Sequence, residues 1–515
     1  MADLVYRGNL KTASFPFLSE LFGRSIIVKG QDQNYVGGLA SKESLDSSVG
    51  VPQLYYCHNV VPIDNGYKSV AYIEYTTAAY PSTAGFSQSN VIRDGAGNSA
   101  QLAIDAVGNV YVLEKGTTVW TLPAGSPVAA SVVGKRITVS LVSGTTYIFF
   151  ENVGCYTYNW GTSTFSSVTL TGLTIANIIG IVGNVGYLLA YSTDAIAWSS
   201  TTDPTDFIPS LITGAGGGNV EGARGKIVTV EEVYGGIIAF CEENAVAGVY
   251  SGNARYPYNF TAITGAGGLT NPFHTAQDTG SGAVYAYTTS GLQIINLKQA
   301  QPVFPEATDF LSGGLLEDYN ELDNELVLED ASGQELIKRL TLIADRYLII
   351  SYGITQLTHA LYYDIGYKQF GRLRINHTDC FEFVSYNNGT VEVPKRSVAF
   401  LGAGGSINIL NTDIVATGSS GVMLIGKFQY VRTRLLTMQQ VELENVNVGD
   451  TFNLYLFPSL DGKTLSPAVT GYELASSGKT RRYGFRNTAL NHTIGFVGAF
   501  TAVSFVLTMT VHGGR

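Results

Sequence analysis

The stretch Ile237-Ile238-Ala239-Phe240, followed after a short turn by Ala245-Val246-Ala247-Gly248-Val249-Tyr250, decides the fold. Each half is an apolar run with the two-residue period of a β-strand. The same construction recurs at residues 283–287 with 291–295, and at residues 136–150. About five consecutive segments of roughly 40 residues are built in this way, which is typical of the blades of a β-propeller. The sequence therefore predicts an all-β protein.

The repeating part occupies residues 55–412, and the sequence on either side of it differs. The predicted blades start near Asn98, Ala130, Ile178, Lys226, Ala276 and Leu336. A short pair of strands at residues 397–409 is expected to close the ring with residues near 55–75. Residues 1–54 are expected to be an N-terminal extension that packs on the disc or on a neighbouring subunit. Residues 413–515 contain about five alternating strands, which predict a β-sandwich or small barrel.

The composition fits a structural all-β chain with an uncharged polar surface. Glycine accounts for 59 of 515 residues, about twice its usual share, and charged residues make up only 14% against a typical ~25%. The net charge is −10, from 31 basic and 41 acidic residues. This balance argues against a dedicated nucleic-acid binder, which needs a basic surface to neutralise phosphates. It leaves room for DNA in transit without sequence specificity, because an acidic wall lets a phosphate backbone slide.

Neither a disulfide framework nor a membrane span is expected. Cys57, Cys155, Cys241 and Cys380 are far apart and show no C-x-x-C spacing, so we expect buried, reduced thiols and a chain made in the cytoplasm. The first residues lack the basic start and apolar core of a signal peptide. Two uncharged stretches, residues 173–191 and 494–511, contain glycines or a strand-like alternation, which favours strands over membrane helices.

The sequence contains no catalytic or metal-binding motif, so we expect no enzyme activity, no cofactor and no metal. The six histidines form no H-x-H or H-E-x-x-H pair, and no phosphate-binding loop or nucleophile elbow occurs. Residues 192–198 resemble a sialidase-type Asp-box, but Ile196 stands where that pattern has glycine, and the motif does not recur. We expect a strand here with Trp198 packed between sheets. Glu231 and Glu232 are neighbours on a predicted strand and should point to opposite faces, so they cannot form the facing pair of a glycosidase.

A resemblance to a known family appears at Trp198-Ser199-Ser200-Thr201-Thr202-Asp203-Pro204-Thr205-Asp206-Phe207. It continues through residues 236–250 and through Arg255-Tyr256-Pro257-Tyr258-Asn259-Phe260, and Asn59-Val60-Val61-Pro62 near the start is similar too. Over roughly residues 55–310 the chain resembles the tail hub, or nozzle, proteins of short-tailed bacteriophages, also called packaged-DNA stabilisation proteins.

The resemblance implies a structural ring protein of the virion tail, made in the cytoplasm of the host bacterium. Such proteins form a six-fold ring below the portal and adaptor, extend or close the DNA exit channel, and have no catalytic residues to carry over. The partners it implies are further copies of the chain, the adaptor or portal ring, tail fibres or tailspikes, and DNA in transit. The ring contacts would be head-to-tail.

Two segments are candidates for a gate that closes the DNA channel. The first is the glycine-rich stretch 213–222, with Thr213, Gly216 and Gly218, which we expect to be a flexible loop. The second is the acidic stretch 317–330, represented by Glu317, Asp318, Glu321 and Asp323. An acidic stretch of this kind is also typical of a solvated loop or short helix. A patch facing a basic partner or the ring lumen is the functional alternative.

Two further groups are candidates for subunit contacts. Tyr234, Tyr250, Tyr256 and Tyr258 cluster in one blade, and tyrosine is enriched in interfaces; packing within the propeller is the alternative.

The second group contains Arg481 and Arg482, with Lys479 and Arg486 close by. It could be a solvated hairpin tip, a contact with an acidic neighbouring subunit, or a DNA backbone contact. On a strand, Lys479 and Arg481 share one face while Arg482 and Arg486 share the other, which weakens the DNA alternative.

A carbohydrate-binding or carbohydrate-active propeller, a lectin or glycosidase, is the alternative function, because a propeller with exposed aromatic residues would also serve it. The single degenerate Asp-box counts against it. An intracellular scaffold of the WD type is disfavoured, because no Gly-His…Trp-Asp signature appears.

Overall fold

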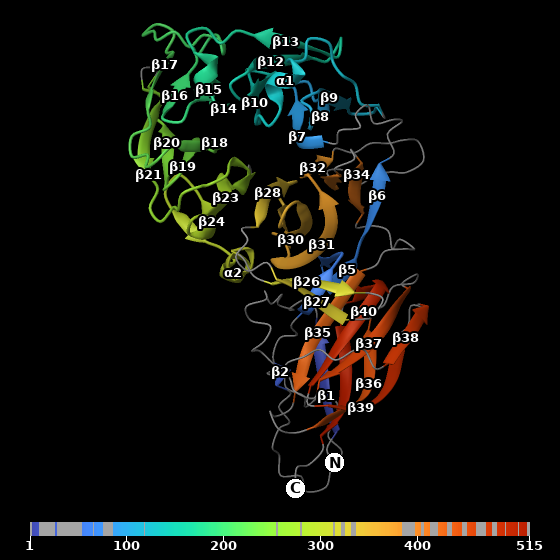
Figure 1. Ribbon diagram of the computed structural model, residues 1–515. Helices are drawn as coiled ribbons and strands as arrows, with labels where there is room; N and C mark the ends of the chain where they lie inside the picture. Colours follow the sequence, from blue (N-terminus) through green and yellow to red (C-terminus); the bar gives the residue numbers. More distant parts are fainter. Residues whose placement is uncertain are drawn as a thin grey trace.

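The structure is a computed structural model, and the part of the chain that it describes consists mainly of β-strands with a few short helices (Figure 1). The residues it describes are 3–9, 26–27, 54–64, 66–75, 86–117, 119–253, 256–278, 281–312, 315–320, 325–330, 336–383, 397–402, 406–411, 421–429, 435–444, 451–459, 470–475, 481–489, 491–502 and 504–511.

The described strands form a β-propeller of seven blades, which follow one another around a ring in Figure 1. Blade one contains β7 (Phe86–Arg93), β8 (Ser99–Asp105) and β9 (Val110–Glu114). Blade two contains β10 (Ile137–Val142), β11 (Thr145–Phe150), β12 (Gly154–Asn159) and β13 (Thr164–Val168). Blade three contains β14 (Gly180–Asn184), β15 (Tyr187–Tyr191), β16 (Ala195–Trp198) and β17 (Gly216–Asn219). Blade four contains β18 (Ile227–Val233), β19 (Gly236–Cys241), β20 (Ala245–Tyr250) and β21 (Tyr258–Ala262). Blade five contains β22 (Thr275–Asp278), β23 (Ala283–Thr288), β24 (Gly291–Ile295) and β25 (Ala300–Pro302). Blade six contains β28 (Ile337–Ile343), β29 (Tyr347–Gly353), β30 (Leu357–Asp364) and β31 (Gln369–His377). Blade seven contains β32 (Asp379–Phe383), β33 (Ser397–Leu401), β34 (Ile407–Asn411) and β6 (Ala71–Tyr75). Helical turns α1 (Ala129–Val132), η3 (Ile175–Asn177), η4 (Pro272–His274) and α2 (Pro305–Leu311) lie in connections between blades, and the hairpin of β26 (Leu315–Asn320) and β27 (Glu325–Asp330) follows α2.

Alternating apolar residues explain why the blades stack on one another. In β19, Ile237 and Ala239 pack with blade three, whereas Ile238 and Phe240 pack with Val284 of blade five. Both faces of the strand are buried, because each sheet is covered by a neighbour on either side. The apolar run that predicted a strand is therefore also the packing surface between blades.

The ring closes through a strand from early in the chain. β34 pairs with β6 in antiparallel register, with Ile409 opposite Ile73. The outermost strand of blade seven thus comes from residues 71–75, and the predicted closure by the pair at 397–409 is confirmed. Because blade seven combines residues 71–75 with strands from residues 379–411, the disc cannot open there without breaking a sheet.

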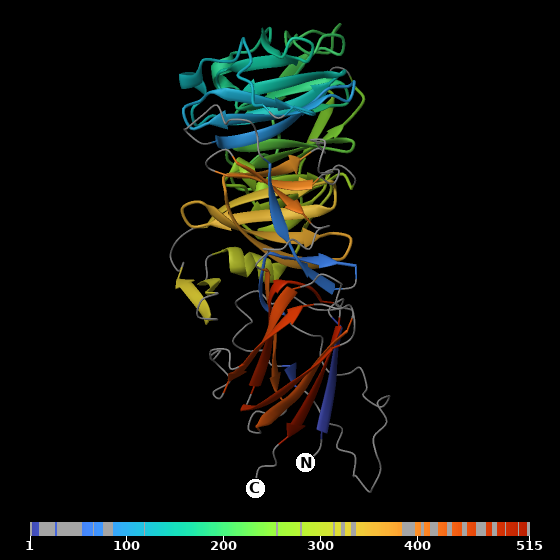
Figure 2. The ribbon, with the colours of Figure 1, turned by 90° about the vertical axis from the view of Figure 1, so that its right-hand side faces the viewer.

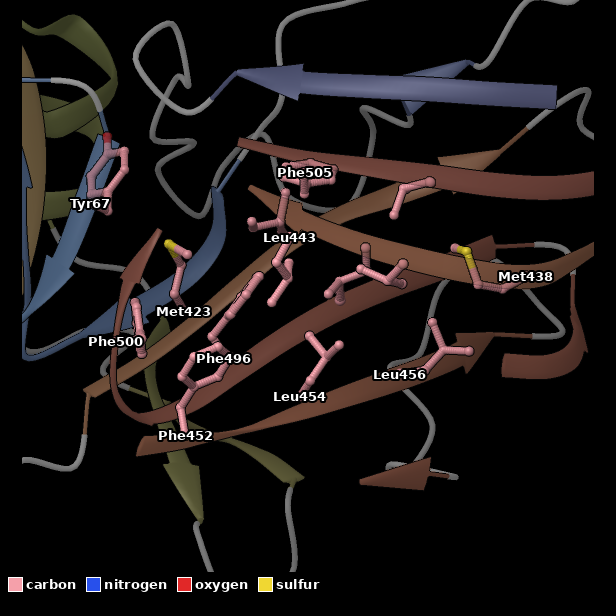
Figure 3. Packing of buried hydrophobic residues seen from close by; sticks show 14 of the residues in the cluster. Tyr67, Met423, Met438, Leu443, Phe452, Leu454, Leu456, Phe496, Phe500 and Phe505 are labelled. Carbon is pink, nitrogen blue, oxygen red and sulfur yellow. The ribbon is translucent and has the colours of Figure 1, made fainter. Parts of the chain in front are cut away.

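Below the disc lies a β-sandwich of two sheets. One sheet has the order β1 (Asp3–Asn9), β42 (Ser504–Val511), β36 (Leu436–Glu444) and β39 (Arg481–Ala489). The other contains β2 (Ile26–Ile27), β35 (Gly421–Gln429), β40 (Asn491–Ala499), β37 (Thr451–Ser459) and β38 (Thr470–Ala475), with β3 (Leu54–His58) also paired to β35. Figure 3 shows Met438 and Leu443 of the first sheet facing Leu454, Leu456 and Phe496 of the second.

The first residues of the chain are part of this sandwich rather than a separate extension. Asp3 lies opposite Thr510, and the whole of β1 pairs with β42. β2 pairs in parallel and β3 in antiparallel register with β35. The expected division at residue 54 therefore differs from the strand pairing, in which the described parts of residues 1–58 belong to the C-terminal sheets.

A shared sheet and a shared apolar cluster join the propeller to the sandwich (Figure 2). Blade six continues outward through β4 (Val60–Ile63) and β5 (Gly66–Ser69) to β41 (Thr501–Ala502), which gives a 7-stranded sheet. β35 uses its two faces differently: Met423 and Ile425 enter the sandwich core, whereas Val422 and Leu424 pack against blade six. Phe457 of β37 joins the same junction. The two parts are thus one packed body.

Buried histidines make this structure sensitive to acid. Burial, together with the smaller effect of the neighbouring Arg372, Arg374, His58 and His377, lowers the pKa of His359 to about 2. Burial likewise lowers the pKa of His377 and His274 to about 4.

In the unfolded chain these side chains take up protons below about pH 6.5, while the folded chain does so only near pH 4 or lower. We therefore expect the free energy of unfolding to fall as the pH drops from 6.5 to 4, by up to about 1.4 kcal/mol per pH unit for each histidine. Denaturation curves across this range test the expectation. His359→Phe, which keeps a ring stacked on Tyr352, should flatten the curve; an unchanged slope in that variant would contradict it.

Candidate functional site: the channel of the propeller

The innermost strands enclose a cavity of about 620 Å³ along the axis of the propeller. They are β7, β10, β14, β18, β22, β28 and β32, and each lies beside the next around the ring. A six-residue inner strand such as β10 spans about 20 Å at about 3.3 Å per residue, and a volume of about 620 Å³ spread over that length corresponds to a passage less than about 10 Å wide. The two grooves of B-DNA are about 8.5 Å and 7.5 Å deep, so a duplex is at least about 16 Å thick. A DNA duplex therefore cannot pass through it.

Polar side chains of the inner strands form hydrogen bonds with the backbone groups at the edges of neighbouring blades. The hydroxyls of Thr138 and Ser140 on β10 accept hydrogen bonds from the backbone of β14, at Ile181 N (2.9 Å) and Gly183 N (2.7 Å). Thr341 of β28 donates to the carbonyl of Cys380 on β32 (3.2 Å). An inner strand has no sheet partner on its channel side, and its free backbone groups need such partners. Many of the polar side chains that line the channel thus form hydrogen bonds between neighbouring blades.

An ion pair between Arg339 and Asp379 joins the blades at the ring closure. Arg339 Nε lies 3.0 Å from Asp379 Oδ1, and both side chains are largely buried. The other carboxylate oxygen accepts from Ser89 of blade one, through its backbone nitrogen (2.7 Å) and its hydroxyl (2.9 Å). The Arg339 guanidinium also lies 4.2 Å from the ring centre of Phe273, near blade five. Burial raises the pKa of Asp379, and Arg339 and Ser89 oppose that rise.

A second polar group surrounds Arg136 at the start of β10. Its guanidinium donates to the Tyr191 hydroxyl (3.2 Å), to the Val228 carbonyl (3.3 Å) and to the Thr229 hydroxyl (2.7 Å). Tyr191 reaches this point because Gly180 has no side chain: a Cβ there would lie 2.3 Å from the Tyr191 hydroxyl oxygen.

Two carboxylates of β18 serve different blades. Glu231 accepts hydrogen bonds from Thr229 (3.2 Å) and from Thr275 of blade five (2.8 Å), whereas Glu232 accepts from Asn184 of blade three (3.2 Å). The prediction that neighbouring carboxylates on a strand point apart is therefore confirmed. Burial raises the pKa of both. In the described part of the chain, no group of three His, Cys, Asp or Glu side chains is arranged to hold a metal ion.

The middle of the glycine-rich gate candidate, residues 216–219, forms a strand, so the expectation of a flexible loop was wrong there, and the role of residues 213–222 as a gate stays a prediction. Gly216 and Gly218 lie in β17, at the outer edge of blade three, and pair with Trp198 and Ile196 of β16. Trp198 is buried and donates from Nε1 to the Gly214 carbonyl (3.0 Å). A Cβ on Gly216 would lie only 3.0 Å from the Trp198 ring, so glycine permits this packing. Thr213 lies just before the strand, where its carbonyl accepts from the Thr201 backbone nitrogen (3.1 Å).

The acidic gate candidate is part of a hairpin rather than a loop or short helix. Glu317 and Asp318 lie in β26, opposite Leu328 and Val327 of β27. Glu321 and Asp323 lie outside the described residues. Figure 2 shows the hairpin projecting from the side of the molecule, near the junction of propeller and sandwich. Its role as a gate stays a prediction.

The four tyrosines divide into two groups. Tyr258 is buried and donates to Asn184 Oδ1 (3.0 Å), and Tyr250 packs against Tyr187 and Tyr258, so these two support the propeller itself. Tyr234 and Tyr256 are 91% and 56% exposed.

The structure also shows where the other residues considered in the sequence analysis lie. Arg481 and Arg482 begin β39, opposite Leu443 and Glu442 of β36. Of the Asp-box-like residues, 192–194 form a turn, with Ser192 donating to Asp194 (2.8 Å), and 195–198 form β16, in which Trp198 is buried as expected. All four cysteines are free and buried. Within the described ranges, no helix has the length and apolar character that a membrane crossing needs.

The residues that build the channel were not found from the sequence. Arg136, Glu231, Arg339 and Asp379 come from four blades and show no common spacing. For the two arginines, a usable signal was the basic residue near the start of a strand with Thr two residues later, as in Arg136-Ile137-Thr138 and Arg339-Leu340-Thr341.

Comparisons with known proteins add little to this description. No family model matches the chain, and no curated protein matches it. Among solved structures, YCF48 from Cyanidioschyzon merolae is 13% identical, covers 67% of this chain and 100% of its own, and has a TM-score of 0.38. The extracellular domain of the one-component system BT4673 from B. thetaiotaomicron is 11% identical over 88% of this chain and 61% of its own, with a TM-score of 0.43. BamB from Moraxella catarrhalis is 12% identical over 69% of this chain and 94% of its own, with a TM-score of 0.36. The β-propeller assignment follows from the strand pairing described above.

Proposed function

We propose that this chain is a structural ring subunit of a short phage tail, a nozzle or hub protein without catalytic activity. The observation that carries the proposal is the 7-stranded sheet that runs from the propeller channel through blade six into the sandwich. It makes propeller and sandwich a single stiff building block, which suits a subunit that must hold its shape in an assembly. The resemblance of residues 198–207 and 236–260 to nozzle proteins supports the same function.

The narrow channel decides where DNA would run in such an assembly. A duplex does not fit inside one propeller, so the DNA path must lie between subunits, along the axis of a ring. We propose six copies in head-to-tail contact, in line with the resemblance. One face of the ring would dock on the adaptor or portal, and the outer side would carry fibres or tailspikes.

Sedimentation of the purified chain tests the proposal. A ring predicts a mass that is a multiple of 55.1 kDa, close to six times that value. Tyr256 is the exposed tyrosine that we assign to the subunit contact, and Tyr256→Ala should shift the protein toward monomers while its circular dichroism stays unchanged. Tyr258→Ala is unsuitable for this test, because Tyr258 is buried in the propeller. A protein that remains monomeric at every concentration would reject the ring.

A further inference from the structure

A second hollow lies where the channel opens beside blades three, four and five. Its volume is about 510 Å³, and its lining includes Asn184, Val185, Glu232, Tyr234 and Gln277. Glu232 and Gln277 also line the channel, so the two spaces meet. The size lies within the range of about 300–1,000 Å³ that is usual for sites of small organic ligands.

The polar groups of this hollow are fixed by hydrogen bonds. Asn184 donates to Glu232 Oε1 (3.2 Å), and its own side-chain oxygen accepts from the Tyr258 hydroxyl (3.0 Å). Gln277 donates to the Glu232 carbonyl (2.6 Å). A carboxylate and two amides are thereby held in place within one small space. Such groups can accept and donate hydrogen bonds to several hydroxyls at once.

Tyr234 adds an exposed aromatic ring beside these polar groups. It occupies the tight turn between β18 and β19, where Val233 pairs with Gly236, and its neighbour Gly235 accepts from the Tyr250 backbone nitrogen (3.0 Å). The turn is thus anchored while the side chain is 91% exposed. Val185, 49% exposed, adds apolar surface to the lining.

We propose that this hollow binds a neutral pyranose sugar. A pyranose has an apolar face of C–H groups, which an exposed aromatic ring can cover, and a rim of hydroxyls, which a carboxylate and amides can bind. The negative charge of Glu232 disfavours phosphate or carboxylate ligands. The inference does not depend on the ring, because all of these residues belong to one propeller.

Saturation-transfer NMR on the full-length protein tests the proposal with the methyl glycosides of glucose, galactose, N-acetylglucosamine and rhamnose. We expect at least one of them to bind. Tyr234→Ala should weaken that binding by about tenfold, which is the size of one lost aromatic contact. Glu232→Gln, which keeps the shape but removes the charge, should weaken it as well.

Val128→Ala is the control, since it truncates a side chain that is 74% exposed and lies outside the hollow and outside the proposed subunit contact, and it should leave binding unchanged. The proposal is overturned if none of the four glycosides binds, or if binding survives both Tyr234→Ala and Glu232→Gln. It is also overturned if Val128→Ala weakens binding as much as Tyr234→Ala. Sedimentation of the same samples reports ring formation separately, so failure of the sugar site and failure of the ring can be told apart.

Discussion

Replacing Phe457 with alanine is expected to lower the free energy of unfolding by about 3–5 kcal/mol. Phe457 is 1% exposed and packs in the cluster that joins the sandwich to blade six, together with Leu424 and residues such as Leu348 and Ile350. Truncation leaves a cavity between two β-sheets that a shared strand network holds in position, so the site cannot collapse to fill it. The midpoint of chemical denaturation measures the loss.

Hydrogen exchange shows where the loss of Phe457 acts. We expect faster exchange in β35 and β37 of the sandwich and in β29 of blade six, and unchanged exchange in blades two and three. Val128→Ala, at a side chain that is 74% exposed, serves as the surface control and should change stability by no more than about 0.5 kcal/mol. A loss below about 1 kcal/mol for Phe457→Ala would mean that the junction does not bind the two parts together.

Replacing Arg339 with methionine is expected to cost about 3 kcal/mol, the lower end of the range for breaking a buried ion pair. The variant keeps most of the apolar bulk but leaves the Asp379 carboxylate buried without its cation. Since Asp379 also holds Ser89 of blade one, the loss weakens the contact between the first and last blades. The double variant Arg339→Met with Asp379→Asn removes both charges and should recover most of the stability.

The effect of Arg339→Met should depend on pH in a defined direction. Burial already raises the pKa of Asp379, and loss of Arg339 raises it further. The folded variant then holds a proton that the unfolded chain, with a carboxyl pKa of about 3.9, gives up. Its stability is therefore lost as the pH rises above about 4, so the deficit relative to the wild type should be larger at pH 7 than at pH 4.5. An equal deficit at both values would show that Asp379 is not left charged and buried.

The sequence predicted the blades that begin near Ile178, Lys226, Ala276 and Leu336, where an inner strand starts, but it missed the inner strand of the first blade. β19 is apolar throughout and stood out, whereas the first predicted blade began near Asn98 although its inner strand is Phe86–Arg93. That strand carries Gln88, Ser89 and Asn90, whose polarity reflects its place beside the channel. The hydrophobic pattern that identifies strands is interrupted where polar side chains form hydrogen bonds with the free backbone edge of a neighbouring blade.

Pairings between distant residues were equally out of reach of local patterns. β1 joins β42 from the other end of the chain, and neither strand contains a signal for the other. The run of glycines at 216–218 indicated a loop, because its fit beneath the Trp198 ring depends on three-dimensional contact. The acidic residues of β26 and β27 likewise obscured a hairpin whose strands alternate with Leu326 and Leu328.

Electron microscopy of the purified full-length chain tests the ring most directly. Class averages are predicted to show closed rings with six-fold symmetry and a central opening wide enough for a DNA duplex. Each subunit should appear as a disc with a sandwich attached at one side of its rim, as in Figure 1. Single particles of one propeller and one sandwich, without rings at any protein concentration, would contradict the proposed function.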